Sequence, residues 1–172
     1  MTNDKRPQVF REATPEVIAT LRGMVAAARH AAMATLEPET GFPLATRVGL
    51  TTLADGTPLV FVSMLAAHTP ALLADPRASL LIGEVGRGDP VAHPRATLYC
   101  RAEQIARQSP EGMAALERIL ASNPKARLYA GLPDFMLFAL SVEHATYNGG
   151  FGKAFRVSGA EYYGGQGVAA HP

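Results

Sequence analysis

Cysteine, excess charge of one sign and long apolar runs are all scarce in this chain of 172 residues, and each scarcity excludes a class of protein. The single cysteine, Cys100, cannot form an intrachain disulfide, and its alternating surroundings favour a buried thiol over a reactive one. The 16 basic and 15 acidic residues leave a formal net charge of +1, which gives no support to a nucleic-acid partner. No apolar run approaches the ~20 residues that span a membrane, and the N-terminus lacks the apolar core of a signal peptide. We therefore expect a cytoplasmic protein with no membrane partner.

Motifs of dedicated metal or nucleophile sites are also missing. None of the five histidines lies three or four residues from another, which argues against a zinc site. No G-x-S-x-G marks an activated serine, and no G-x-G-x-x-G follows a strand, so a dinucleotide fold is poorly supported. We expect no metal, and no catalytic residue can be assigned from these patterns.

The composition is that of one folded domain. A hydrophobic content of 48% allows a real core, and 172 residues leave little room for a second domain. We take residues 1–172 as a single domain, with residues 1–13 as a flexible N-terminal arm and residues 158–172 as a glycine-rich tail that is free to move.

Periodicity and turn signals predict a mainly β protein. Thr14 and Pro15 open an amphipathic helix, Thr69 and Pro70 a short one, and Ser109 caps a third. An Asp-Gly turn at 55–56 joins two strands that should pair as an antiparallel hairpin. Six strands are expected: 44–53, 58–65, 77–85, 95–106, 135–148 and a short one after the glycines at 149–152. This order favours a six-stranded antiparallel barrel with peripheral helices.

Four residues around one corner form a candidate phosphate site. Arg47 lies within an apolar strand, where a buried guanidinium needs an anion or a carboxylate; an exposed sheet position is the alternative. Ser63 ends the next strand, within hairpin reach of Arg47. His68 and Thr69 follow where a helix starts, although Thr69 could simply cap that helix. Together these groups could cradle a phosphate.

Two further stretches could approach a flat ligand. The first places His93 and Arg95 at the entrance of a strand. The second, GGFGKAF, combines three glycines with Phe151, which could cover one face of a ring, and with Lys153. A β-bulge corner is the structural alternative for the second stretch.

Three segments resemble the pyridoxamine 5'-phosphate oxidase-like flavoproteins, and within them the haem-utilisation (HugZ-type) branch. They are 45–84, 88–103 and 129–154, and the pieces HT…L..DPR.SLL and GGFG.A are fairly specific for that branch. The resemblance covers roughly residues 31–154. It implies a split β-barrel, FMN as cofactor, and a homodimer with the flavin at the subunit interface.

The resemblance also assigns site residues by position. It implies that the Arg-containing strand and the end of the following strand approach the flavin, and that the polar pair opening the short helix holds the phosphate. Arg95 and the GGFGK corner, with Phe151 and Lys153, match segments that approach the cofactor. The chain departs from the pattern at Pro70 and Ala71, where relatives carry side-chain donors. The cofactor residues implied first are Arg47, Val48, Gly49, Ser63, Met64, Leu65, His68 and Thr69.

Three functions remain open at this point. The first is an FMN-dependent oxidoreductase of unknown substrate, in which the flavin performs the redox chemistry and the protein supplies placement. The second is a haem-binding or haem-degrading protein, with Arg47, Arg95 and Lys153 as partners of the propionates and a histidine on the iron. The third is a flavin carrier or sensor without turnover.

Overall fold

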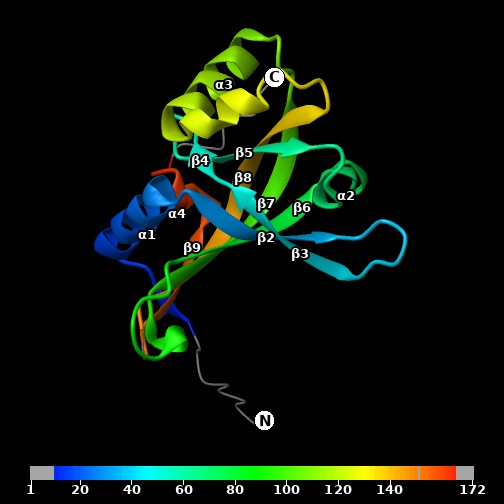
Figure 1. The fold of residues 1–172 in the computed structure, drawn as a ribbon. Helices are drawn as coiled ribbons and strands as arrows, with labels where there is room; N and C mark the ends of the chain where they lie inside the picture. Colours follow the sequence, from blue (N-terminus) through cyan, green and yellow to red (C-terminus); the bar gives the residue numbers. More distant parts are fainter. Residues whose placement is uncertain (1–9, 151, 166–172) are drawn as a thin grey trace.

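Nine strands form one mixed sheet in the computed structural model, which describes residues 10–150 and 152–165. The sheet order is β1-β9-β8-β7-β6-β2-β3, with β5 added to β8 and β4 to β5 (Figure 1). Every ladder is antiparallel except that between β1 and β9. The strands are β1 (Arg11–Glu12), β2 (His30–Leu36), β3 (Pro43–Gly49), β4 (Thr51–Thr52), β5 (Pro58–Ser63), β6 (Arg77–Ile82), β7 (Arg95–Ile105), β8 (Phe135–Asn148) and β9 (Ala154–Ser158).

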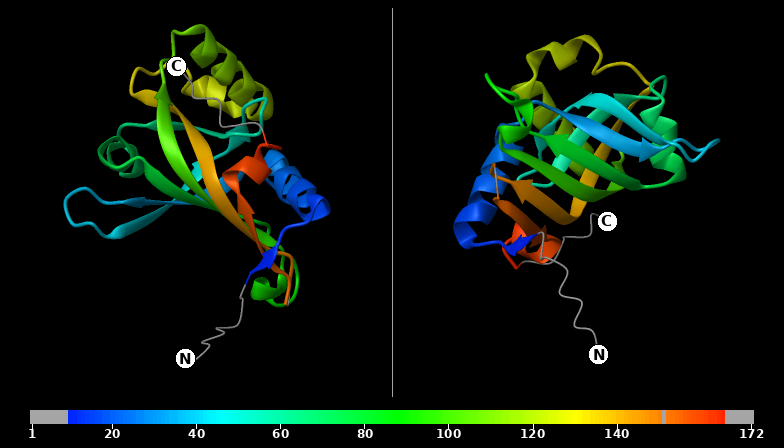
Figure 2. Two further views of the ribbon diagram at one scale, coloured as in Figure 1. Left: turned by 180° about the vertical axis from the view of Figure 1, so that it is seen from behind. Right: turned by 90° about the horizontal axis from the view of Figure 1, so that it is seen from below.

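Helices lie around the sheet. Helices α1 and α4 are neighbours on one flank, and α3 with η2 covers one end (Figures 1 and 2). The side chains of Thr14 and Ser109 accept hydrogen bonds from Val17 N and Gly112 N, which confirms both predicted caps. The helices are α1 (Pro15–Ala27), α2 (His68–Ala74), α3 (Pro110–Ser122) and α4 (Gly159–Tyr162), with 3₁₀ turns η1 (Pro90–Ala92) and η2 (Pro124–Leu128).

The predicted fold class, a mainly β split barrel with peripheral helices, is confirmed. Six of the described strands have six or more residues, and β1, β4 and β9 are shorter. The sequence patterns do not predict β2, although its side chains alternate between buried and exposed, with Ala31, Met33 and Thr35 inside. Three alanines in seven residues give this strand little β-propensity. The predicted strand 44–53 is in fact two strands, β3 and β4.

The partner of β3 differs from the prediction. It pairs with β2 along its whole length, from Leu36↔Pro43 to His30↔Gly49. Of the predicted strand 44–53, only the β4 part pairs with β5, at Thr51↔Leu59 and Thr52↔Pro58. The expected antiparallel hairpin is therefore confirmed at its turn end but does not extend to Arg47, because in the described residues β3 and β5 are not hydrogen-bonded to each other. This separation is the split in the barrel.

Strand β8 changes partners along one edge. Residues 135–139 pair with β5 and residues 144–148 with β9, while β7 pairs along the other edge. In the gap, the Tyr163 hydroxyl accepts a hydrogen bond from Val142 N at 3.0 Å. A Cβ at Gly159 would lie 2.6 Å from Val142 O, so only glycine lets α4 pack here.

The segment expected to be a mobile tail is packed where the structure describes it. Ser158 closes β9, Tyr162 and Tyr163 are buried, and the Tyr162 hydroxyl donates to Gly56 O at 2.8 Å. The Ser158–Glu161 capping box opens α4, and this S-x-x-E pattern was a readable helix signal. Residues 166–172 lie outside the described part, as do residues 1–9 of the predicted arm; residues 11–12 form β1.

Two apolar clusters stabilise the molecule. The larger fills the barrel, with Leu80, Leu98 and Leu140 fully buried, and the smaller lies beneath α3 around Leu137 and Ile119. Cys100 is in the larger cluster, which confirms the predicted buried thiol, and burial raises the pKa of that thiol. Within the described residues, no helix has the length and apolar character needed to cross a membrane. The same residues contain no cluster of three or more metal-ligating side chains.

Close packing at the start of α3 makes Gly112 irreplaceable. A Cβ there would lie 2.0 Å from Ala106 O, so we expect Gly112→Ala to lower the free energy of unfolding by about 2 kcal/mol or more. Gly23 in α1 is the matched control, because a Cβ there meets nothing within 4 Å, and Gly23→Ala should stabilise by about 0.5–1 kcal/mol. Urea denaturation measures both. Equal stability of the two variants would contradict this packing.

Candidate functional site

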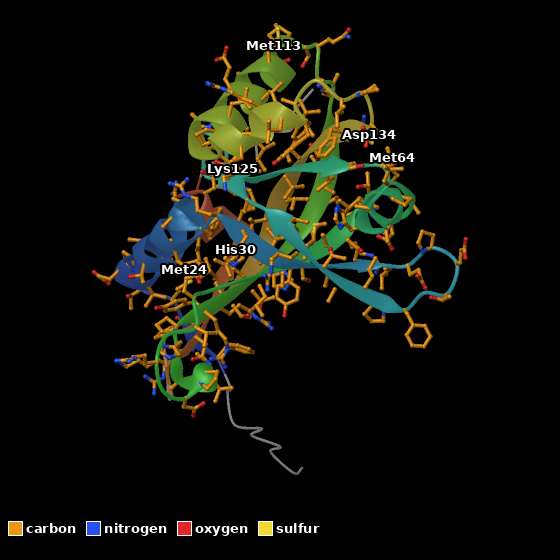
Figure 3. All side chains as sticks on the ribbon, in the orientation of Figure 1. Met24, His30, Met64, Met113, Lys125 and Asp134 are labelled. Carbon is orange, nitrogen blue, oxygen red and sulfur yellow. The ribbon has the colours of Figure 1, made fainter. Side chains whose placement is uncertain are left out.

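Ser63 is the centre of the predicted phosphate corner, and its hydroxyl is fully engaged. It donates to Asp134 Oδ2 at 2.5 Å and accepts from Leu65 N at 3.0 Å. Met64 N in turn donates to Asp134 O at 2.8 Å. Figure 3 shows Asp134 beside Met64, at the end of β5. Met64 and Leu65 therefore lie beyond the strand, and both side chains are exposed.

Thr69 does not cap α2. The helix begins two residues earlier than predicted, with Ala67 as N-cap and no side-chain cap bond. The Thr69 side chain is fully buried, and its hydroxyl donates to Ser63 O at 2.6 Å. The alternative that Thr69 is a helix cap is thus wrong; its hydroxyl instead ties the helix to the end of β5.

His68 is the buried polar group of this corner. Its side chain is 7% exposed, and its Nδ1 is buried without a hydrogen-bond partner in the described structure. Burial lowers the pKa of the imidazole, so the neutral form is favoured at neutral pH. An unpartnered buried nitrogen is costly, and a polar atom of a bound ligand could satisfy it.

Arg47 is exposed and lies opposite Ala32 of β2. If the β4–β5 register continued along β3, Arg47 would face Ser63, but the ladder stops at Thr51. Some Cα atoms of β3 and β5 still lie within 8 Å of each other. The structure thus keeps Arg47 and Ser63 on neighbouring strands, on the two sides of the split.

The split leaves backbone groups of β3 without a strand partner. Leu50 N donates to Arg29 O at 3.0 Å. This bond fixes which residues of β3 direct their main-chain groups at β2 and which direct them to the opposite side, since the two alternate along a strand. By this alternation the amide groups of Arg47 and Gly49 point away from β2, towards β5. Val48 between them is buried in the core. Gly49 therefore offers main-chain donors and acceptors to the gap, whereas the Val48 side chain supports the fold.

A pocket of about 340 Å³ opens at the split. Its wall includes Gly49, Phe61 and Tyr129, and the two rings are stacked with centroids 6.0 Å apart. The Arg107 guanidinium lies over the Phe61 ring, 5.5 Å from its centroid. The sequence analysis did not identify these aromatic residues, because they come from β5 and from the loop after η2, 68 positions apart in sequence.

Arg95 and the glycine corner lie at the other end of the barrel. Ser63 pairs with Phe135 at one end of β8, and Arg95 with Asn148 at the other, about 40 Å along the strand. Arg95 donates to Val91 O at 2.7 Å and so holds the loop before β7. Lys153, at the glycine corner, is exposed. Phe151 lies outside the described residues. One chain does not bring this corner to Ser63.

The outer face of β6, β7 and β8 carries a second concave region. Tyr99 and His144 stack with centroids 4.2 Å apart and planes at 12°. Both line a pocket of about 270 Å³, together with Ser79 and Arg77. A β-bulge follows this pair, and Glu143 there bonds Arg101 at 3.1 Å. The lone His144 gave no sequence signal, since its aromatic partner is on another strand.

Comparison with known proteins identifies the family. The sequence model of a family described as pyridoxamine 5'-phosphate oxidase matches residues 17–149. The chain belongs to this family. The predicted resemblance is confirmed, and so is its haem-utilisation branch, because the similar proteins include several haem proteins.

Two of the similar proteins with 30% identity or more are haem proteins. A chloroplastic non-canonical heme oxygenase, HOZ, from Arabidopsis thaliana is 31% identical over 119 residues, which are 69% of this chain and 36% of that protein. A heme binding protein from Mycobacterium smegmatis is 30% identical with a TM-score of 0.77, covering 90% of this chain and 62% of that one. The chain therefore spans only about a third of the plant relative and less than two thirds of the mycobacterial one.

A second solved structure supports the fold alone. HutZ, a heme storage protein from Vibrio cholerae, is 22% identical with a TM-score of 0.64. The similarity covers 77% of this chain and 92% of HutZ. The shared architecture at this low identity indicates that the split barrel, rather than any one side chain, is the common feature.

The buried imidazole of His68 should make stability depend on pH. Its pKa is lowered in the fold, so the unfolded chain binds the proton first as pH falls. The contribution is complete above the ordinary value of 6.5 and is lost as pH falls below it. We expect the urea midpoint to fall between pH 7.5 and pH 5.5, and to fall less in His68→Gln.

Exposed His30 provides the control. His30→Gln should retain the decline of the wild-type protein, because the replaced side chain is in contact with water. An identical pH dependence in wild type and His68→Gln would show that the His68 imidazole is not the titrating group.

Proposed function

We propose that this family member is an FMN-binding flavoprotein whose ring lies in the split between β3 and β5. The observation that carries the proposal is the unpaired β3 edge at Arg47 and Gly49, beside a pocket with an aromatic wall. An exposed strand edge offers alternating donors and acceptors. The polar edge of an isoalloxazine needs such partners, and its flat face needs an apolar surface.

The residues of the split fit this ring better than they fit a porphyrin. A porphyrin core presents no peripheral hydrogen-bonding edge, so the main-chain groups of Arg47 and Gly49 would remain unsatisfied beside it. The Phe61 and Tyr129 rings would lie along the pocket wall. When bound, the flavin supplies the redox chemistry. The chain positions the ring, and the Arg47 cation favours an electron-rich partner.

The phosphate end is supported by fewer groups. Arg47 is an exposed cation of β3, and His68 Nδ1 is an unpartnered buried nitrogen in the described structure. The hydroxyls of Ser63 and Thr69 are already bonded within the protein. The ring, and not the phosphate, should therefore supply most of the affinity. An oxidoreductase of unknown substrate and a flavin carrier without turnover both fit this arrangement.

Haem is the second candidate, on a different surface. Two relatives at 30–31% identity are a heme oxygenase and a heme binding protein. In this chain the specific observation is His144, which lines an outer pocket and stacks on Tyr99. A neutral imidazole is a haem ligand. His144 is the candidate ligand, with Arg77 of the same pocket as a propionate partner.

Flavin titration tests the first candidate. We expect micromolar binding of FMN, seen as a change in its visible spectrum. Gly49→Val should weaken binding about tenfold, because the new side chain enters the pocket and takes space from the ligand. The protein itself has room for the change, since a Cβ at Gly49 meets nothing within 4 Å. Ala45→Val, on the same face of β3 but outside the pocket, should bind like wild type.

A parallel haem titration separates the candidates. A Soret shift that His144→Ala abolishes, together with no FMN binding, would replace the flavin proposal by the haem one. Flavin binding without reduction by NAD(P)H would instead support the carrier.

We further propose a homodimer that buries the outer face of β2, β6 and β7 and brings the two flavin sites to the subunit interface. Ala32 and Ala34 lie opposite Leu81 and Ser79 on this face. Leu81 and Tyr99 are exposed there, and no helix covers the face in the view from below (Figure 2, right). Small side chains around a few large apolar ones suit a self-complementary interface.

Sedimentation equilibrium tests the dimer. Wild type should have twice the mass of one chain, and Leu81→Asp should weaken association about thirtyfold or more. Leu128→Asp is the control, because Leu128 is exposed on η2, away from this face. A wild-type monomer at micromolar concentration would contradict the proposed interface.

A further inference from the structure

We propose that Asp134 withholds the Ser63 hydroxyl from the phosphate of a bound flavin, so that FMN and riboflavin bind with nearly equal affinity. This inference rests on the flavin binding proposed above. Asp134 is thereby a specificity-determining residue, which controls how much the phosphate contributes.

The hydrogen-bonding capacity of Ser63 is the first argument. A serine hydroxyl has one proton to donate, and here Asp134 Oδ2 accepts it at 2.5 Å. Leu65 N donates to the same hydroxyl at 3.0 Å. A phosphate oxygen accepts hydrogen bonds and donates none when ionised. It can use Ser63 only by displacing the carboxylate.

The charge of Asp134 is the second argument. The described ion pairs all involve other acidic residues. No described basic side chain therefore lies within 4 Å of the Asp134 carboxylate. A carboxylate without an ion-pair partner next to Ser63 repels a phosphate monoester placed at the same hydroxyl. A neutral ribityl chain meets no such repulsion, since its hydroxyls can donate to the carboxylate.

The fixed position of Asp134 is the third argument. Its backbone oxygen accepts from Met64 N at 2.8 Å, which joins the loop to the end of β5. Arg107 holds the same loop by donating to main-chain oxygens on both sides of Asp134. These are Leu132 O at 2.6 Å, Phe135 O at 3.3 Å and Ala130 O. These bonds hold the loop backbone in place, and the carboxylate itself is held by its bond to Ser63.

Fluorescence titrations with FMN and riboflavin test the inference. Wild type should show dissociation constants within about threefold of each other, because the phosphate gains little. Asp134→Asn keeps the size and an acceptor oxygen but removes the charge. It should bind FMN about tenfold more tightly while riboflavin changes less than about twofold.

Two further proteins complete the test. Glu117→Gln removes the same charge from the exposed face of α3 and should behave as wild type. In the double variant Ser63→Ala/Asp134→Asn the gain in FMN affinity should shrink, since the hydroxyl that the phosphate would use is missing.

The outcomes separate this inference from the proposed function. An unchanged ratio of FMN to riboflavin affinity in Asp134→Asn, with both flavins bound, overturns the role of Asp134 alone. Loss of riboflavin binding in Asp134→Asn also overturns it, because the residue would then support the ring site. Failure of wild type and every variant to bind either flavin overturns the proposed function and this inference with it.

Discussion

Backbone pairing between β2 and β3 is the constraint on which the candidate site depends. One edge of β3 pairs with β2 up to Gly49, and Leu50 extends that pairing by donating to Arg29 O, while the other edge of β3 is not hydrogen-bonded to β5 in the described residues. Only the two residues of β4 return to β5. The gap, its main-chain polar groups and the aromatic pocket all follow from that departure. The site is thus formed by strand geometry, and few of its features depend on a particular side chain.

Local signals predicted much of the fold. Thr14 and Ser109 cap their helices as expected, and β8 has the expected bounds of 135–148. Where prediction failed, the deciding contact was distant in sequence. The alanine-rich β2 becomes a strand because β3 and β6 lie on either side of it. Tyr162 and Tyr163, surrounded by glycines, are ordered by Gly56, Thr57 and Val142.

The candidate site was predictable only in part. Ser63, His68 and Thr69 do gather at one corner, because a strand end and the following helix are close in the chain. Their hydrogen-bond partners were not predictable, since Asp134 reaches Ser63 from 71 residues away. Arg95 was expected near the flavin, but the length of β8 separates it from Ser63 within one chain. Sequence order cannot show which strand ends meet.

The hydrogen bonds from Arg107 to the loop before β8 affect which sequence changes this loop can accept during evolution. The guanidinium holds main-chain oxygens only, and every residue type supplies one. Side chains along this loop can therefore be exchanged while its path is kept. Under the proposed role of Asp134, replacing that one acidic side chain would change ligand preference while the path of the loop is kept.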